Sequence, residues 1–428
     1  MGDTLKRLAI LHYAAPPVVG GVEATIAHHA RLLAGAGYPV DVIAGRGEPF
    51  HPQVALHLIP EIDSRHAEVL ALGQALARGQ VPPSFDRFRE QLAGQLRPIL
   101  AGAGVCIVHN AMTLHKNLAL TAALRQLADE GATRFIAWCH DFAWQDALYT
   151  PELHPGYPWD LLRTPWPGVR YVVVSTHRRA RLAELLGIPE GQVEVVNPGV
   201  DVVEQLKLQP ATCALLEKVD LLAADPLLLL PARITRRKNI ELAIRVTAAL
   251  IRRKPGAGLV VTGPPGAHNP TNVSYLESLR ALRRELGVAE HVHFLYEYGE
   301  RGQPLHLTGA TMADLYLLAD LLLFPSQREG FGIPVLEAGL ARLPVFAADI
   351  PSVRESAGGL AHLFDPNGDP GAVADAIAAH LEADGTYQLR RRVLSQFTWQ
   401  SAVHHRLLPL LKEVIEHGNR AGQSPKAP

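Results

Sequence analysis

Cysteine is scarce in this sequence, with three residues in 428 (Cys106, Cys139 and Cys213). Because these three are widely separated and embedded in apolar runs, the sequence disfavours a disulfide framework or a zinc site. The amino terminus lacks a signal-peptide pattern, and the chain lacks an apolar run of membrane-spanning length. We therefore expect a cytoplasmic protein without a transmembrane segment, with peripheral contact to a membrane surface left open.

An excess of positive charge is also absent, since 41 Lys and Arg residues face 42 Asp and Glu residues. Without such an excess a protein cannot readily follow a phosphate backbone, so we expect no nucleic-acid partner. The sequence contains neither a complete G-x-G-x-x-G motif nor a G-x-x-x-x-G-K-[ST] motif. The first of these absences disfavours a nicotinamide dehydrogenase.

Short apolar runs are present along the whole chain and alternate with stretches of helical periodicity. Their weak polar–apolar alternation is typical of parallel strands that are buried on both faces of a sheet. We expect strands at residues 7–13, 39–44, 105–110, 134–141, 171–175 and 193–201, and again at 227–233, 258–263, 292–296, 320–326, 344–349 and 361–365. The pattern predicts an α/β protein of two Rossmann-like, doubly wound domains, with ligands bound beyond the carboxyl ends of the strands in a cleft between them.

The expected domain boundaries follow from these two series of predicted strands and helices. We place the first Rossmann-like domain at residues 1–203 and the second at residues 204–398. Residues 399–417 are predicted to form a helix that crosses back to the first domain. Residues 418–428 have the composition of a flexible tail.

The stretch EGFGIPVLE (329–337) places two carboxylates, Glu329 and Glu337, around a glycine-rich turn. Pro334 suits the first turn of a helix, so the amides at positions 331–333 become free donors at a helix amino terminus, which attracts anions. Glu337 is one turn inside the helix and is suited to the vicinal hydroxyls of a ribose. The simpler alternative is a first-turn acid with a solvated loop acid, and spacing alone does not decide between them.

The stretch PARITRRKNIELA (231–243) supplies cations at a second strand end. Arg233 and Lys238 are predicted to grip phosphate oxygens, while Arg236 and Arg237 fit the alternative of a solvated basic loop. A Gly-Gly turn at 20–21 opens the first helix of the chain. Its amides suit a diphosphate, although such turns are common.

Taken together, EGFGIPVLE, the R…RRKN loop, GGVE (20–23), HD (140–141) and NPGVD (197–201) resemble the motifs of the GT-B-fold retaining glycosyltransferases of family 4. They occur in the family's order and span almost the whole chain. The resemblance implies a second domain that binds a nucleotide-sugar donor and a first domain that receives the acceptor. It also implies front-face transfer, in which the departing phosphate accepts the acceptor's proton.

The resemblance assigns roles to individual residues. The catalytic set is His140, Arg233, Lys238 and Glu329. The nucleotide and diphosphate set is Gly20, Gly21, Arg233, Lys238, Gly263, Tyr296 and Glu337. The donor sugar is assigned to Glu329, Phe331, Gly332 and Ile333. Acceptor contacts by His109 and Asn110 are expected from the topology, because both residues stand at the end of a predicted strand. For His140, the alternative is a core histidine that is satisfied by the backbone.

The predicted function is a metal-independent, retaining hexosyl transfer from a UDP- or GDP-linked sugar to a hydroxyl acceptor. No cofactor is expected, and no metal site, because no cluster of ligand residues with suitable spacing lies near the predicted diphosphate site. The acceptor, whether a sugar, another small molecule or a lipid-linked molecule, is not predicted. The loop at 143–160 matches no known acceptor site, and the loop at 262–275 is longer than usual, which leaves the donor base open. A sugar-nucleotide epimerase on the same fold and a binding module without catalysis are the alternatives.

Overall fold

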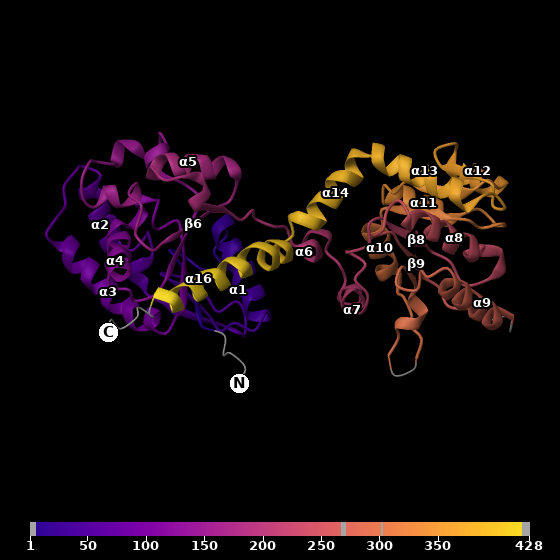
Figure 1. Ribbon diagram of the computed structural model, residues 1–428, viewed down its shortest axis with the longest axis horizontal. Helices are drawn as coiled ribbons and strands as arrows, with labels where there is room; N and C mark the ends of the chain where they lie inside the picture. The colour runs from indigo at the N-terminus through magenta and orange to yellow at the C-terminus, as the bar shows by residue number, and fades with distance from the viewer. Residues whose placement is uncertain (1–5, 267–270, 301–302, 422–428) are drawn as a thin grey trace, which may run out of the picture. The chain divides into compact units, whose positions relative to one another are not determined.

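The computed structural model describes residues 6–266, 271–300 and 303–421 (Figure 1). Contacts within the chain divide it into two compact units, Met1–Gly199 with Phe397–Pro428, and Val200–Gln396. We call them unit 1 and unit 2 and describe each by itself.

Unit 1 is built on a parallel sheet with the order β3-β2-β1-β4-β5-β6-β7 in the described residues. Its strands are β1 (Leu8–His12), β2 (Val40–Ala44), β3 (Val54–Leu58), β4 (Val105–His109), β5 (Phe135–Cys139), β6 (Arg170–Val173) and β7 (Val193–Val195). Its helices are α1 (Gly21–Gly35), α2 (Ala67–Leu76), α3 (Ser84–Ala101), α4 (Leu118–Asp129), α5 (Thr176–Leu186), α15 (Trp399–Ala402) and α16 (Leu408–Ala421). The sequence prediction omitted β3, which is an edge strand with only one fully buried position and therefore lacks a continuous apolar run.

Strand residues of unit 1 alternate between two helical layers. Ala9 and Leu11 of β1 belong to the apolar cluster with α3 and α4, whereas Leu8 and Ile10 belong to the cluster with α1 and α16. The sheet is therefore buried on both faces, which explains the uninterrupted apolar runs of its central strands.

Unit 2 repeats this plan with the order β10-β9-β8-β11-β12-β13 in the described residues. Its strands are β8 (Leu227–Leu230), β9 (Gly258–Val261), β10 (Val292–Phe294), β11 (Leu321–Phe324), β12 (Val345–Ala348) and β13 (His362–Phe364). Its helices are α6 (Val202–Leu206), α7 (Pro210–Lys218), α8 (Ile240–Ile251), α9 (Thr271–Glu285), α10 (Gly309–Leu318), α11 (Ile333–Leu340), α12 (Pro351–Ala357), α13 (Pro370–Ala383) and α14 (Gly385–Gln396). The predicted fold class, two doubly wound α/β domains, is confirmed.

Each strand order reverses once, between β1 and β4 in unit 1 and between β8 and β11 in unit 2. In doubly wound sheets, ligands bind beyond the carboxyl ends of the strands at this switch point. The two candidate regions are therefore the loops after β1 and β4, and the loops after β8 and β11.

The carboxyl-terminal segment packs against the sheet of unit 1, where Val403, Leu407 and Leu411 join the cluster formed with α1. The segment contains α15, a π-helical turn at Val403–Leu407, and α16. The helix thus extends beyond the predicted end at 417 to Ala421, and the remainder of the predicted tail, 422–428, lies outside the described residues. None of the helices in the described part of the chain combines the length and apolar character that a membrane crossing requires.

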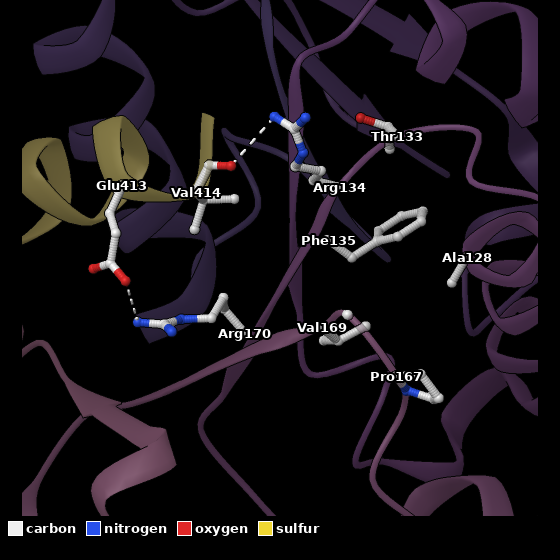
Figure 2. A pocket seen from close by; sticks show the side chains of 10 residues that line it. Ala128, Thr133, Arg134, Phe135, Pro167, Val169, Arg170, Glu413 and Val414 are labelled. Atoms are coloured by element: carbon white, nitrogen blue, oxygen red, sulfur yellow. Dashed lines mark hydrogen bonds and ion pairs between the residues drawn. The ribbon is translucent and has the colours of Figure 1, made fainter. Parts of the chain in front are cut away.

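Two arginines hold α16 in place (Figure 2). Arg134 donates to the carbonyl oxygens of Val414 (3.2 Å) and Ile415 (2.8 Å), and Arg170 pairs with Glu413 at 3.1 Å. A cavity of about 470 Å³ lies beside these contacts. Because its lining includes the residues that lead into β5 and β6 and the first residue of each strand, it is at the amino-terminal edge of the sheet, opposite the expected ligand edge.

Candidate active site

The loops after β8 and β11 are joined by backbone and side-chain contacts at the switch point of unit 2. Residues Arg236–Lys238 form a 3-10 turn after β8. The amide of Gln327 donates to the carbonyl oxygen of Arg237 (2.9 Å), and Arg237 Nη1 donates to the carbonyl oxygen of Arg328 (3.1 Å). The two sequence motifs, 90 residues apart, therefore form one surface.

Lys238 and Glu329 form the central ion pair of this surface. Lys238 Nζ lies 2.5 Å from Glu329 Oε1, and each side chain is 9% exposed. Arg237 Nη1 contacts the other carboxylate oxygen at 3.2 Å. Burial alone would raise the pKa of Glu329, but hydrogen bonds from Lys238 and Ser326 and the charges of Lys238 and Arg237 together outweigh burial and lower the pKa. Arg237 is exposed, as expected for a solvated loop residue, but its ion pair with Glu329 was not predicted.

Arg233 is exposed, and the described residues offer it no hydrogen bond or ion pair. Its neighbours Ala232 and Ile234 are buried, and the amide of Ile234 donates to the carbonyl oxygen of Pro264 (3.0 Å), so the backbone at this position is fixed. The structure thus presents a guanidinium that has no partner among the described residues, in the loop that leads from β8 to Lys238.

Gly263 has a packing role. A Cβ at this position would lie 2.5 Å from the carbonyl oxygen of Ala232 and 2.7 Å from Arg233 Cα. Its amide already donates to the carbonyl oxygen of Ala232 (3.0 Å) and is therefore not free for a nucleotide. The predicted direct contact of Gly263 with the nucleotide is not supported by this geometry, because the glycine instead allows the loop that carries Arg233 to approach β9.

Helix α11 begins with backbone donors that have no partner in the described residues. Gly332 has φ of +91°, which favours glycine, and its carbonyl oxygen accepts from the amide of Val335 (2.9 Å). The amides of Phe331, Gly332 and Ile333 make no hydrogen bond within the described chain, and the side chains of Phe331 and Ile333 are exposed. Free amides at a helix amino terminus form an anion-binding surface.

Glu337 lies inside α11 and accepts a hydrogen bond of 2.5 Å from the hydroxyl of Tyr316 in α10. Burial raises the pKa of Tyr316, so the hydroxyl remains a donor at neutral pH. This bond fixes one carboxylate oxygen of Glu337. Tyr296 lies in a 3-10 turn, Leu295–Tyr298, and is half-buried against the core of unit 2.

Three neighbouring strands of unit 1 end at histidines that contact one another. His12 ends β1, His109 ends β4, and His140 follows β5. His12 Nδ1 lies 3.1 Å from the carbonyl oxygen of His109, and His109 Nδ1 lies 3.1 Å from His140 Nε2. Asn110, at φ of +59°, accepts from the amide of His140 (2.8 Å) and thereby fixes the start of that loop.

His109 and Asn110 support His140 and do not face open space. Their exposed fractions are 0% and 5%, so the expected direct contact with an acceptor is not supported. Burial, with smaller contributions from nearby His12 and Arg178, lowers the pKa of His140 to about 4. His140 is therefore a neutral imidazole at pH 7, able to donate or accept a hydrogen bond.

Gly20 and Gly21 stand at the start of α1 in unit 1. Gly20 precedes the helix with extended backbone, and a Cβ there would lie 2.2 Å from the Glu23 carboxylate. Glu23 Oε1 lies 3.9 Å from His12 Nε2, so this turn approaches the histidine group. In the described residues, no group of three or more His, Cys, Asp or Glu side chains is arranged to hold a metal ion.

The buried histidines predict a loss of stability in acid. Burial lowers the pKa of His12, His29, His109 and His140, to about 3 for His29. Below pH 6.5 the unfolded chain binds protons that the folded protein does not, so stability falls as the pH falls. For His29 alone, the free energy of unfolding should drop by about 2 kcal/mol between pH 7.5 and 5.

Urea unfolding at the two pH values checks this expectation. Trp138 and Trp399 lie 4.8 and 5.7 Å from His29, so their fluorescence reports on this region. The variant His29→Leu should show a smaller drop than the wild type, and His405→Leu, at an exposed position, should not. An equal drop in His29→Leu and the wild type would contradict the assignment.

Some candidate residues were missed by sequence reasoning. Arg237 was visible in the RRK run but could not be separated from a solvated charge, and Tyr316 lies in an ordinary apolar helix with no local signal. His12 and Glu23 were not singled out. Their relevance depends on which strand ends are neighbours, which spacing along the chain does not reveal.

Two family models match the chain. The model described as "Glycosyltransferase Family 4" matches residues 19–204, and the model described as "Glycosyl transferases group 1" matches residues 216–395. These matches cover the sheets of unit 1 and unit 2, respectively, except for β1.

Individual relatives agree with the family models. One relative is a GDP-mannose-dependent alpha-(1-6)-phosphatidylinositol monomannoside mannosyltransferase of Mycobacterium tuberculosis (strain ATCC 25618 / H37Rv). It is 30% identical over 50% of this chain, and the matched region spans about half (51%) of that protein. A D-inositol 3-phosphate glycosyltransferase of Actinosynnema mirum is 28% identical over 81% of each chain. Among solved structures, a sucrose-phosphate synthase from Thermosynechococcus elongatus aligns over 96% of this chain and 100% of that chain, with 17% identity and a TM-score of 0.39.

Proposed function

Because the chain belongs to the family 4 glycosyltransferases of the GT-B fold, we propose that it transfers a hexosyl group from a UDP- or GDP-linked sugar to a hydroxyl acceptor, with retention of configuration. The observation that carries the proposal is the cluster at the switch point of unit 2. There Lys238 and Arg237 share one carboxylate, Glu329, and Arg233 in the same loop has no partner among the described residues. Positive charge therefore exceeds negative charge where a diphosphate would bind.

The proposed chemistry is stabilisation of a leaving group. When the bond between the sugar and the diphosphate breaks, negative charge grows on the bridging oxygen. Arg233 and Lys238 neutralise this charge, and the amides at 331–333 donate to the phosphate oxygens. The departing phosphate then accepts the proton of the acceptor hydroxyl on the same face of the sugar.

Glu329 has two tasks in this proposal. In the free protein its carboxylate compensates Lys238, whose ammonium would otherwise be buried without a partner. When the donor's phosphates approach Lys238, they neutralise part of its positive charge. Glu329 can then accept hydrogen bonds from sugar hydroxyls. His140 in unit 1 is proposed to hydrogen-bond a sugar hydroxyl as a neutral imidazole.

The proposal includes no metal ion or other cofactor. Two or three cationic side chains neutralise a diphosphate in the way that a magnesium ion does elsewhere. We therefore expect a chelator to leave transfer unchanged, and the name of the mycobacterial relative favours GDP-mannose as the first donor to try.

The direct experiment is a donor screen by thermal unfolding and by product analysis. UDP- and GDP-linked hexoses are added singly, and a donor that binds the folded protein raises its melting temperature. With the stabilising donor and a panel of hydroxyl acceptors, NMR of the product should show the anomeric configuration of the donor retained. Release of an inverted sugar, or conversion of the donor sugar without an acceptor, would contradict the proposal.

Glu337→Gln should weaken donor binding without removing transfer. The variant keeps the hydrogen bond from Tyr316 but loses the negative charge that is proposed to accept two ribose hydroxyls. We expect the donor's Michaelis constant to rise about tenfold, since a hydrogen bond to a charged group contributes roughly 1.5–3 kcal/mol. Steady-state kinetics measure this change, and an unaltered Michaelis constant would remove Glu337 from the nucleotide site.

A further inference from the structure

A second cavity in unit 1 lies on the ligand edge of its sheet. It has a volume of about 280 Å³ and is lined by α2, by residues after β4 and by the loop at 143–160. All three segments follow the carboxyl ends of parallel strands, since α2 follows β3 and the loop follows β5. This is the edge at which doubly wound sheets bind ligands, in contrast to the cavity of Figure 2.

The rim of this cavity carries a carboxylate in a fixed orientation. His115 Nε2 lies 3.0 Å from Glu152 Oε2. Burial lowers the pKa of His115, so its neutral ring has a single N–H, and the carboxylate, which only accepts, places that proton on Nε2. The second oxygen of Glu152 makes no hydrogen bond with the described residues and is available to a ligand.

Further polar groups lie around the same opening. Lys116 Nζ is held 4.3 Å from the centre of the Tyr149 ring, and Ser64 and Gln74 contribute a hydroxyl and an amide. Lys116 and Glu152 carry opposite charges, so the rim has no excess of either sign. This composition suits a neutral ligand with several hydroxyl groups better than an anion.

The walls of the cavity are apolar. Val69, Leu76 and Leu118 line it together with the indole of Trp159, which is 3% exposed. A sugar or cyclitol ring has apolar C–H faces and a polar edge of hydroxyls. Such a ring therefore matches an apolar wall with a few convergent polar groups.

We propose that this cavity binds a neutral polyhydroxylated ring, a monosaccharide or cyclitol unit of the acceptor. The statement that the ring belongs to the acceptor rests on the proposed transferase function. The binding itself does not, because it requires neither a donor nor unit 2. An experiment can therefore distinguish a failure of the proposed ring binding from a failure of the proposed transferase function.

A pair of glycine variants tests the cavity by filling it. Gly73 in α2 lines the cavity, and a Cβ there would meet no atom within 4 Å, so Gly73→Phe places a ring in open space. Gly94 in α3 is equally unobstructed but does not line the cavity, which makes Gly94→Phe the matched control. Both proteins should fold, and their melting temperatures check this.

Ligand-observed NMR with methyl α-mannopyranoside, methyl α-glucopyranoside and myo-inositol, each at millimolar concentration, measures binding without a donor. We expect at least one probe to bind the wild type and Gly94→Phe, and to lose binding in Gly73→Phe. Absence of binding for all three probes, or equal binding by both variants, would overturn the proposal.

A second pair of variants tests the carboxylate. Glu152→Gln should weaken binding of the same probe by about tenfold, because a charge-assisted hydrogen bond is lost. Glu190→Gln is the control, since Glu190 is 53% exposed against 54% for Glu152 and is likewise paired, with Arg179 at 3.2 Å. In turnover with an identified acceptor, Glu152→Gln should raise the acceptor's Michaelis constant and leave the donor's unchanged. A change in the donor's constant alone would overturn the assignment to the acceptor.

Discussion

Replacing Lys238 with Met is expected to reduce transfer by about 10²- to 10³-fold, the usual cost of removing one preorganised charge-stabilising group. The methionine keeps most of the volume of the lysine but removes the ammonium that lies 2.5 Å from Glu329. Affinity for the nucleoside diphosphate should fall in parallel, because the same ammonium contacts the product in the proposed mechanism. Initial rates and calorimetric titration with the diphosphate measure the two effects.

The same change has a structural consequence that must be separated from the chemical one. Glu329 would be left 9% exposed with Arg237 as its remaining ion-pair partner among the described residues, and breaking a buried pair costs roughly 3–5 kcal/mol. The double variant Lys238→Met/Glu329→Gln removes the orphaned charge, so it should regain stability without regaining transfer. Arg236→Ala is the control in the same turn, since Arg236 stacks on Tyr275. Normal turnover by Lys238→Met would remove Lys238 from the mechanism.

Replacing Gly263 with Ala is expected to destabilise unit 2 by about 3 kcal/mol or more, because overpacking against backbone cannot be relieved by a side-chain rotation. The new methyl group would lie 2.5 Å from the carbonyl oxygen of Ala232, so either β9 or the loop that carries Arg233 must shift. A loop shift would move Arg233, and donor affinity should fall even at temperatures where the variant is folded. Thermal unfolding and donor titration measure the two quantities.

Gly339→Ala is the matched control for this glycine. Gly339 lies within α11, where a Cβ would meet no atom within 4 Å and alanine is the better helix former. The control should be as stable as the wild type or slightly more stable. If Gly263→Ala matched it in both stability and donor affinity, the close approach at this strand end would be refuted.

Much of the fold could be predicted from sequence because the physical signal is local. A strand buried on both faces must be apolar at every position, as in Leu227–Leu230, and such runs are visible without knowledge of the partners. The edge strand β3 lacks this requirement, since its burial is mixed, and it was missed. The strand order was not predicted, because apolar runs do not reveal which strands are neighbours.

Part of the candidate site was predictable, because some of its residues directly follow the ends of predicted strands. Lys238 and Glu329 were identified because each follows an apolar run that ends in a loop. Their mutual ion pair and the participation of Arg237 were not, because a contact between residues 91 apart leaves no local pattern. The predicted nucleotide contact of Gly263 stays a prediction, and the close approach of neighbouring backbone explains this glycine without a ligand.

The proposed function is tested most directly by the place where a nucleoside diphosphate binds. A crystal structure of the protein with GDP or UDP would show this place. We expect the diphosphate within hydrogen-bonding distance of Arg233, of Lys238 and of the amides at 331–333 in unit 2. A diphosphate bound at any other place in the molecule would contradict the proposed function.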